Sequence, residues 1–233
     1  MSGSELKVLS AGAVKRGVSR IAAEFERTTG TRVAVEFTTA PEVRKRATGG
    51  EAADVIVAPH AVMDDLAREG KILSDTRGLL GRSRMGIVVH ADSSPPDIGD
   101  TAAFKKLLAG ATAVVYNRAS SGLYTSKLLE KLGLAAELGS KTVVVDSGAA
   151  VMEYVAGHAP GAVGLAQISE IMVLVDKGSS IKLAAPLPDE IQNVTSYDAA
   201  ATASSATQDA ARALARALTS AEAKKVFAAT GIS

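Results

Sequence analysis

The first 37 residues change between two hydrophobic patterns. Residues 6–9 form a short apolar run, which predicts a strand buried on both faces. From Val14 to Phe25, apolar residues recur at steps of three and four, which is typical of one face of an amphipathic helix. Gly30 suits the left-handed C-cap of that helix, and apolar residues alternate again over 33–37. We therefore expect a strand–helix–strand unit here.

Short apolar runs and helical periodicities keep alternating along the rest of the chain. This alternation favours an α/β fold with mostly parallel sheets. The apolar segments 171–175 and 181–183 are assigned to neither type. Further strands are predicted at 54–58, 85–90, 112–116, 143–145 and 162–165, and further helices at 41–50, 63–70, 104–108, 124–133, 149–156, 207–218 and 221–229.

Small residues follow the first predicted strand, at 10–13, where the sequence reads Ser-Ala-Gly-Ala. Such residues let the chain turn sharply and let a ligand approach the backbone N–H groups. The helix N-terminus that follows carries unpaired N–H donors and a partial positive charge, which suit an anion. A similar turn, Ala-Ser-Ser-Gly, occurs at 119–122. Two α/β lobes that each offer a helix N-terminus to a shared cleft would explain the recurrence.

The composition narrows the choice of function. The chain has 233 residues, 47% of them hydrophobic, a net charge of +1 and no cysteine. Disulfides, thiolate chemistry and zinc–sulfur sites are therefore excluded, and no basic excess indicates nucleic acid or an acidic membrane as a partner. The sequence shows neither a membrane-spanning apolar stretch nor a leader peptide. The compartment stays open: periplasmic if a leader was removed, cytoplasmic if Met1 is native.

Familiar enzyme motifs are missing from the sequence. It contains no GxSxG, P-loop, HExxH or complete GxGxxG motif. His60, His90 and His158 are not spaced as metal ligands, so we expect neither a metal nor a cofactor. Asp64 and Asp65 are expected on a solvated helix flank. Proton transfer needs only one positioned base, so an enzymatic function stays open.

Five segments carry a resemblance to a known family. The chain resembles the type-2 periplasmic solute-binding proteins, specifically the molybdate-binding-protein-like branch, over essentially its whole length. The segments are Leu6–Ala13 (LKVLSAGA), Phe25–Gly30 (FERTTG), Ala53–Val57 (ADVIV), Leu218–Ala223 (LTSAEA) and the tail at Gly231–Ile232.

The resemblance implies an α/β, two-lobe periplasmic-binding-protein-like fold (type 2) with a ligand cleft between the lobes. One lobe would hold residues 1–83 plus 194–233 and the other 84–193, with hinges near 83–84 and 193–197. The ligand would be clamped by hinge closure. It further implies a monomer that binds a small anion, with an ABC permease as partner and no direct membrane insertion.

The chain departs from the molybdate pattern at three places. The helix-start serine is Ala13, the second loop reads Thr38-Thr39-Ala40, and the tyrosine after the lobe-2 strand is replaced by residues 165–167, Leu-Ala-Gln. Together with Arg84 and Arg118, these departures favour a small organic carboxylate over a tetrahedral oxyanion. The segments Gln167–Glu170 and Pro186–Pro188 are similar to a side branch that includes aconitate isomerase-like proteins.

We therefore weigh two main functions. The first is a solute-binding protein that captures an organic carboxylate or an oxyanion such as molybdate. The alternative is an aconitate isomerase-like enzyme that interconverts cis- and trans-aconitate by proton transfer, with His60 as the catalytic base. A regulator's effector domain fits the fold, but the sequence lacks a helix-turn-helix. The candidate ligand-binding residues lie at strand ends and helix starts: Ser10, Gly12, Ala13, Thr38, Thr39, His60, Arg84, Arg118, Ser120, Ser121, Gly122, Ser147, Gly148 and Gln167.

Overall fold

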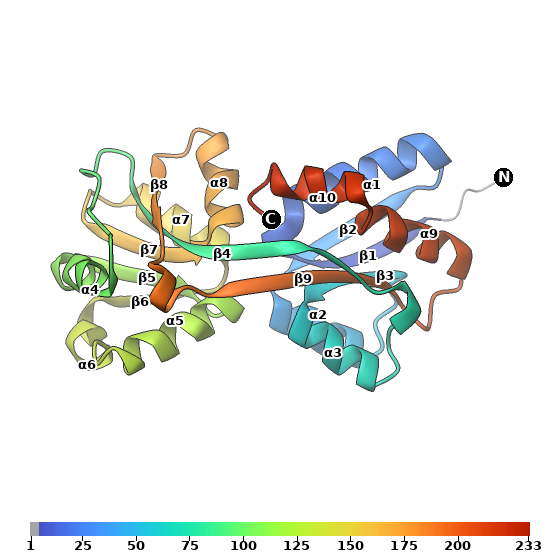
Figure 1. Cartoon of the computed structure of the whole chain (residues 1–233), viewed down its shortest axis with the longest axis horizontal. Coiled ribbons are helices and arrows are strands. Elements are labelled where there is room, and N and C mark those ends of the chain that lie inside the picture. Colours follow the sequence, from blue (N-terminus) through green and yellow to red (C-terminus); the bar gives the residue numbers. More distant parts are fainter. Residues whose placement is uncertain (1–4) are drawn as a thin grey trace. The chain divides into compact units, whose positions relative to one another are not determined.

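The computed structural model describes residues 5–233 and separates them into two compact units. Unit 1 holds the chain up to Ser83 together with Thr195–Ser233, and unit 2 holds Arg84–Val194 (Figure 1). The chain passes from unit 1 to unit 2 inside strand β4 (Gly78–His90) and returns at the start of strand β9 (Val194–Ala201). No described helix is long and apolar enough to cross a membrane.

Unit 1 is built on a sheet in which β1 lies between β2 and β3, both parallel to it. Strand β9 pairs with β3 in the antiparallel direction. The strands are β1 (Leu6–Ala11), β2 (Val33–Thr38) and β3 (Val55–Pro59); the helices are α1 (Lys15–Thr29), α2 (Ala40–Thr48), α3 (His60–Arg68), α9 (Gln208–Leu218) and α10 (Ala221–Ala228), with short 3-10 turns η1 (Gly12–Val14) and η2 (Ser74–Thr76).

Helix α1 follows the amphipathic pattern of its sequence. Val18, Ala22 and Phe25 are buried on its inner face. The helix ends at Gly30, which has φ +71° and donates its N–H to the carbonyl of Glu26. A left-handed cap of this kind strains any residue with a Cβ. The predicted strand–helix–strand unit is therefore confirmed, including its C-cap.

The strands of unit 1 are buried on both faces. Leu6 and Val55 belong to a core that also contains Phe227 of α10, while Leu9 and Ile56, on the other face, pack with α2 and α3. Full burial of such a side chain stabilises the fold by about 1.5–3 kcal/mol relative to exposure. Continuous apolar runs without alternation are thus explained by helices on both sides of the sheet.

Unit 2 repeats the plan with β5 between β6 and β7, all parallel. Strand β4 runs antiparallel to both β7 and β8. The strands are β5 (Ala113–Asn117), β6 (Thr142–Val145), β7 (Ala162–Gln167) and β8 (Ile181–Pro186); the helices are α4 (Thr101–Gly110), α5 (Ser120–Lys131), α6 (Ala135–Leu138), α7 (Gly148–Gly157) and α8 (Ile168–Asp176), with 3-10 turns η3 (Gly139–Lys141) and η4 (Asp189–Ile191).

The predicted α/β class is confirmed. The pairings of β1 with β2 and β3, and of β5 with β6 and β7, are parallel as expected, whereas β4, β8 and β9 add antiparallel pairings. The sequence did not predict β9, whose residues 197–201 read Tyr-Asp-Ala-Ala-Ala. Alanine and aspartate are depleted in strands, so pairing with β3 rather than local preference decides this strand. The unassigned apolar segment at 171–175 lies in helix α8.

Candidate functional site

In unit 1, the carboxyl ends of three strands meet at one edge of the sheet. Ala11 is level with Thr38, and Ala58 is level with Asp198 of the antiparallel strand β9. The helical segments that begin with η1, α2 and α3 all start at this edge. It therefore brings together six predicted residues: Ser10, Gly12, Ala13, Thr38, Thr39 and His60.

The first of these residues are tied into the local structure. Ser10 is fully buried in β1, and its hydroxyl donates to the carbonyl of Ala11 at 3.2 Å. Ala13 is also buried, in the turn η1. Thr39 is the N-cap of α2 and makes no side-chain capping hydrogen bond. The helices that begin at this edge offer free backbone N–H groups to a ligand. The Ser10 hydroxyl instead donates its hydrogen bond within the strand.

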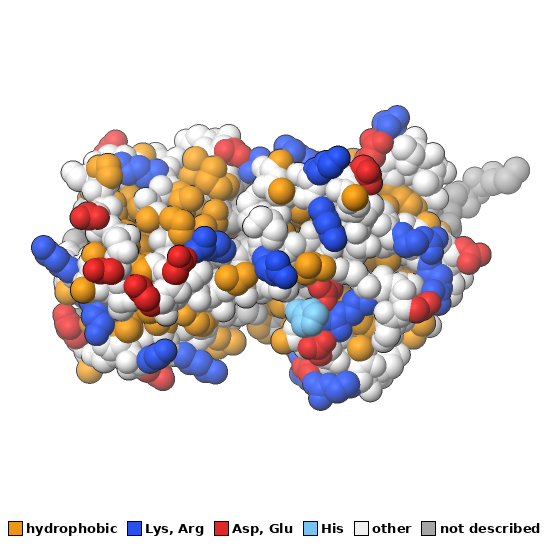
Figure 2. Space-filling model, in the orientation of Figure 1, with side chains coloured by type: hydrophobic (Ala, Val, Ile, Leu, Met, Phe, Trp, Pro, Cys, Tyr) orange, Lys and Arg blue, Asp and Glu red, His pale blue; other side chains and the backbone are white. Residues whose placement is uncertain are grey.

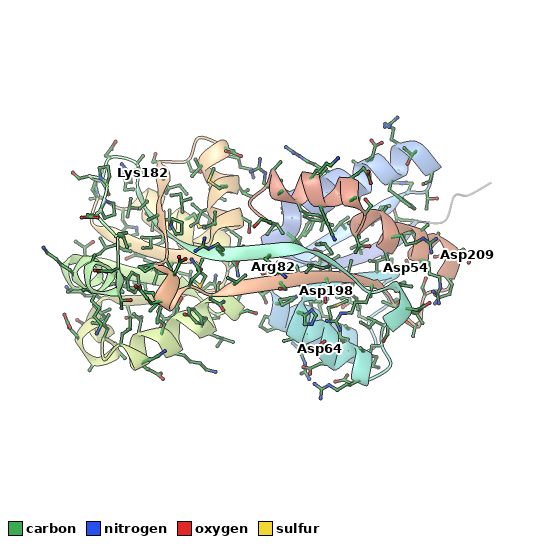
Figure 3. All side chains as sticks on the ribbon, viewed as in Figure 1. Asp54, Asp64, Arg82, Lys182, Asp198 and Asp209 are labelled. Atoms are coloured by element: carbon green, nitrogen blue, oxygen red, sulfur yellow. The ribbon has the colours of Figure 1, made fainter. Side chains whose placement is uncertain are left out.

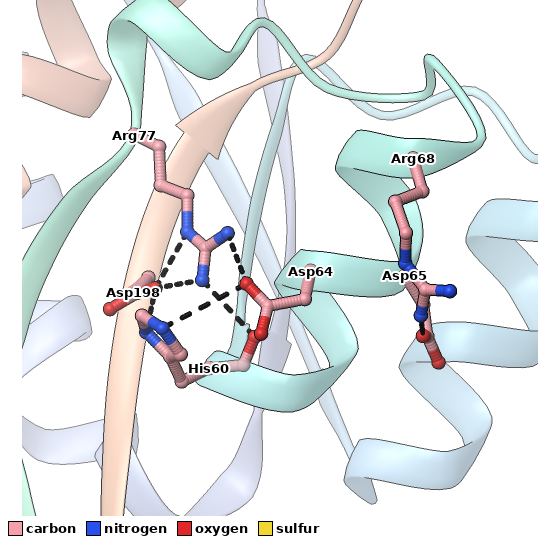
Figure 4. A network of polar contacts seen from close by, with 6 residues as sticks. All are labelled: His60, Asp64, Asp65, Arg68, Arg77 and Asp198. Carbon is pink, nitrogen blue, oxygen red and sulfur yellow. Dashed lines mark hydrogen bonds and ion pairs between the residues drawn. The ribbon is translucent and has the colours of Figure 1, made fainter.

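His60 is the first residue of α3, and its ring meets a buried carboxylate (Figure 4). Nδ1 of His60 lies 2.8 Å from Oδ2 of Asp198. The His60 side chain is 60% exposed, whereas that of Asp198 is 3% exposed. Nε2 lies 3.8 Å from Oδ1 of Asp64, one turn further along α3. The His60 ring therefore lies at the surface, and its Nδ1 contacts the buried carboxylate of Asp198.

Arg77 joins this cluster from the segment between η2 and β4. Its Nε and Nη2 lie 2.7 Å from Oδ2 of Asp198, and its Nη1 lies 2.7 Å from Oδ1 of Asp64. Nη2 also donates to the backbone carbonyl of His60 at 3.1 Å. Burial opposes the charge of Arg77, but the hydrogen bonds to Asp64 and Asp198 outweigh it and raise the Arg77 pKa. The hydrogen bond from Arg77 lowers the pKa of Asp64.

Sequence reasoning missed Arg77 and Asp198, which lie 121 residues apart. Figure 3 shows Asp198 on β9 and Asp64 in the same part of unit 1. No local signal marked Asp198, because an aspartate is usually exposed and its burial here depends on the ion pair with Arg77. Asp64 was expected on a solvated flank; it is half exposed, yet it is held by Arg77.

In unit 2, the predicted residues also gather at one edge. Asn117 is level with Val145 at the ends of β5 and β6, and Met85 is level with Gln167 at the end of β7. Helices α5, α7 and α8 begin there. The residues at this edge are Arg84, Arg118, Ser120, Ser121, Gly122, Ser147, Gly148 and Gln167.

Both predicted arginines have acidic partners. Arg84 forms an ion pair with Asp189, and Arg118 forms one with Asp146. The two aspartates are about nine-tenths exposed, at 91% and 89%. An exposed ion pair of this kind contributes at most about 1 kcal/mol to stability. A ligand carboxylate can therefore replace either aspartate at small cost. Figure 2 shows that acidic and basic side chains are interspersed on the face drawn.

Three other predicted residues of unit 2 have structural roles. A Cβ added to Gly122 would lie 1.4 Å from the carbonyl oxygen of Asn117, so close packing requires glycine there. The side chains of Ser121 and Asn117 hydrogen-bond each other at 3.2 Å. Ser147 is the N-cap of α7 and accepts the N–H of Ala150 at 3.2 Å. These contacts account for the three residues without a ligand.

Glu170 brings a carboxyl group to the same edge. A Cβ added to Gly148 would lie 2.2 Å from Oε2 of Glu170, so this carboxyl lies against the first residue of α7. Burial raises the pKa of Glu170. A hydrogen bond from the backbone of Gln167 lowers it by less, and the resulting pKa is about 7. The N-cap Gln167 and Glu170, three residues later, have the spacing of a capping box, a signal that sequence reasoning did not use.

A cavity of about 650 Å³ lies at the other edge of unit 2. Its lining includes Val89, Leu107, Ala111 and Ala162, near the end of β4 and the starts of β5 and β7. None of the predicted site residues lines it. Among residues 5–233, no three histidine, aspartate or glutamate side chains are grouped to hold a metal ion.

The family of this chain is evident from its sequence. The profile described as bacterial extracellular solute-binding protein matches residues 6–233. This chain belongs to that family. The resemblance to solute-binding proteins is therefore confirmed over nearly the whole chain.

Solved structures of this kind share the fold. The periplasmic molybdate-binding protein of Azotobacter vinelandii superposes with a TM-score of 0.81, at 19% identity, over 98% of both chains. The sulfate-binding protein of Mycobacterium tuberculosis H37Rv superposes with a TM-score of 0.78, at 16% identity, over 98% of this chain and 86% of that one. The type-2 binding-protein fold is therefore confirmed.

A curated relative is an enzyme. An aconitate isomerase from a Pseudomonas species is 28% identical over 235 residues, which cover 97% of this chain and 87% of the relative. The two proteins thus correspond along nearly their whole lengths. The similarity agrees with the side-branch resemblance at Gln167–Glu170.

Proposed function

We propose that this solute-binding protein captures a small organic anion with more than one carboxylate. The observation that carries the proposal is that, within each unit, the predicted site residues gather at the one sheet edge where three helical segments begin. Backbone N–H groups at such edges suit oxygen anions. The two units are proposed as the two ligand-binding lobes, and capture by hinge closure and delivery to an ABC permease remain predictions.

The residue types support an organic carboxylate over a tetrahedral oxyanion. Ala13 offers only its backbone where the molybdate pattern has a serine, and the Ser10 hydroxyl is used within β1. Arg84 and Arg118 are guanidinium groups in exposed ion pairs. A guanidinium binds a planar carboxylate through two parallel hydrogen bonds.

A thermal-unfolding screen tests this proposal. The ligands are molybdate, tungstate, sulfate, phosphate, citrate, cis-aconitate and trans-aconitate. A ligand at 100-fold its dissociation constant adds about 2.7 kcal/mol to the free energy of unfolding. We expect citrate or the aconitates to raise the melting temperature more than molybdate does. A shift with molybdate or sulfate alone would replace the organic anion with an oxyanion, and no shift with any of the seven would contradict the proposal.

The second candidate function is an aconitate-type isomerase on the same scaffold. Two observations favour it: the aconitate isomerase relative, and the contact between His60 and the buried Asp198. Such an enzyme removes a proton from the CH₂ carbon next to the double bond and returns it to the other end of the allyl system. The double bond then moves by one position, and no oxidant, metal or co-reactant enters the balance.

Proton NMR distinguishes the two functions. The protein is incubated separately with cis- and trans-aconitate, and the ratio of isomers is followed. An isomerase drives both samples to the same ratio. A binding protein leaves each sample unchanged while still showing the thermal shift, so an unchanged ratio after long incubation excludes the isomerase.

A further inference from the structure

We propose that Asp198 and Arg77 hold His60 in position as a general base, with Nε2 presented for proton transfer on an unsaturated polycarboxylate. The proposal deepens the second candidate function and rests on it. His60 is the catalytic residue in this assignment. Asp198 and Arg77 are positioning residues, because both act through His60.

The contact with Asp198 selects the tautomer of His60. A carboxylate only accepts hydrogen bonds, so Nδ1, at 2.8 Å from Oδ2 of Asp198, carries the proton in the neutral ring. Nε2 then keeps its lone pair. Since the side chain is 60% exposed, this nitrogen can be reached by a molecule at the sheet edge. A base needs this combination of a fixed ring and an accessible lone pair.

The charges of the cluster suit a base that gains and loses a proton. Around a neutral imidazole, Asp64, Asp198 and Arg77 have a combined formal charge of −1, which becomes zero when Nε2 takes a proton. The imidazolium formed lies between Asp198 at 2.8 Å and Asp64 at 3.8 Å. A buried carboxylate that stabilises the imidazolium is the arrangement of serine-hydrolase triads. Arg77 holds both carboxylates in place through bonds of 2.7 Å.

Packing alone does not explain why His60 is held here. Its exposed ring buries little surface, and Arg77 already reaches Asp198 through two nitrogen atoms. His60 lies at the edge where η1 and α2 also begin. Their N–H groups suit the carboxylates of a substrate whose CH₂ proton moves to Nε2. The electron pair of the broken C–H bond spreads over the allyl system until the proton returns to the other carbon.

The test uses the whole chain with aconitate in deuterium oxide. NMR follows two readouts, the isomer ratio and deuterium incorporation into the CH₂ group, and thermal unfolding reports binding. We expect His60→Gln to abolish both NMR signals, and the thermal shift reports separately whether the variant still binds aconitate. His158→Gln is the matched control, an exposed histidine of unit 2 bonded to a backbone carbonyl, and should behave like the parent.

Asp198→Asn tests positioning. An asparagine can turn its amide toward Nδ1 and reverse the tautomer, so we expect kcat to fall by at least about 100-fold with little change in KM. Free imidazole should restore part of the activity of His60→Ala, which a purely structural histidine would not allow. If Asp198→Asn does not fold, ¹⁵N NMR of the parent decides: Nδ1–H supports the proposal and Nε2–H overturns it.

The outcomes separate this proposal from those it rests on. A parent that binds aconitate without exchange or isomerisation overturns the base and leaves the binding function intact. If the parent isomerises aconitate and His60→Gln does so at the full rate, the isomerase function is supported. The assignment of His60 as the base is then overturned. A parent that neither binds nor converts aconitate overturns the isomerase and the base together, and the citrate arm of the thermal screen then decides the proposed binding function.

Discussion

Nε and Nη2 of Arg77 both lie 2.7 Å from the same oxygen of Asp198, whose side chain is 3% exposed on β9. This pair joins the segment before β4 to a strand near the other end of the chain. Removing one partner of a buried ion pair leaves an uncompensated charge. The pair therefore has a structural role in addition to the positioning role proposed for it.

Asp198→Ala should lower the free energy of unfolding by about 3 kcal/mol, the lower end of the range for breaking a buried pair from one side, because Arg77 keeps its bond to Asp64. Urea unfolding of parent and variant measures the difference. The matched control is Asp75→Ala, which breaks a more exposed aspartate–arginine pair of unit 1, with Arg212 at 2.5 Å, and should lower the stability much less. Equal losses of unfolding free energy in the two variants would contradict the structural role of the buried Asp198–Arg77 pair.

Glu170 should make stability depend on pH. Burial raises its pKa from 4.5 to about 7 in the folded chain, so the folded state binds this proton more tightly than the unfolded state does. The stabilisation is complete below pH 4.5 and is lost as the pH rises through about 7. At about 1.4 kcal/mol per pKa unit, the loss is of the order of 3 kcal/mol.

Urea unfolding at several pH values from 4.5 to 8 checks this prediction. Glu170→Gln keeps the size of the side chain and has no carboxylate to ionise. The difference in unfolding free energy between parent and Glu170→Gln should therefore change with pH in the stated direction. A constant difference across the range would show that Glu170 titrates normally.

Gly122→Ala tests whether this position serves packing. The added Cβ would lie 1.4 Å from the carbonyl oxygen of Asn117, which no side-chain rotation relieves. We expect a loss of about 3 kcal/mol or more, at the upper end for overpacking. Gly110→Ala is the control, a helical glycine with open space around it, and should stabilise by up to about 1 kcal/mol. Thermal unfolding with no loss of stability in Gly122→Ala would contradict the packing requirement.

Arg118→Ala should weaken binding of an organic carboxylate by about 1.5–3 kcal/mol, the range for a hydrogen bond to a charged group. Titration calorimetry with the best ligand of the screen measures the change. Arg212→Ala removes a guanidinium from the ion pair with Asp75 in unit 1 and serves as the control, because Arg212 is not one of the predicted site residues. Equal affinity of Arg118→Ala and the parent for every tested anion would remove Arg118 from the site.

Much of the candidate site follows from local patterns. A turn of small residues, such as 10–13 or 119–122, marks the boundary between a strand and the following helix. Parallel strands bring these boundaries to one edge of the sheet. The fourteen predicted residues accordingly fall at one edge of each unit. What the side chains do there was not predictable. Arg84 and Arg118 meet aspartates, and Gly122 is required by packing, because these partners approach only through the fold.

The sequence by itself determined the α/β class, the family and elements such as the α1 helix with its Gly30 cap, because these depend on periodicity and backbone preference within a few residues. Tertiary structure alone decided the strand at 197–201 and the cluster of His60, Arg77 and Asp198. Alanine-rich β9 is a strand because β3 supplies its hydrogen bonds. Asp198 is buried beside Arg77 because folding joins segments 121 residues apart, a contact that no local pattern encodes.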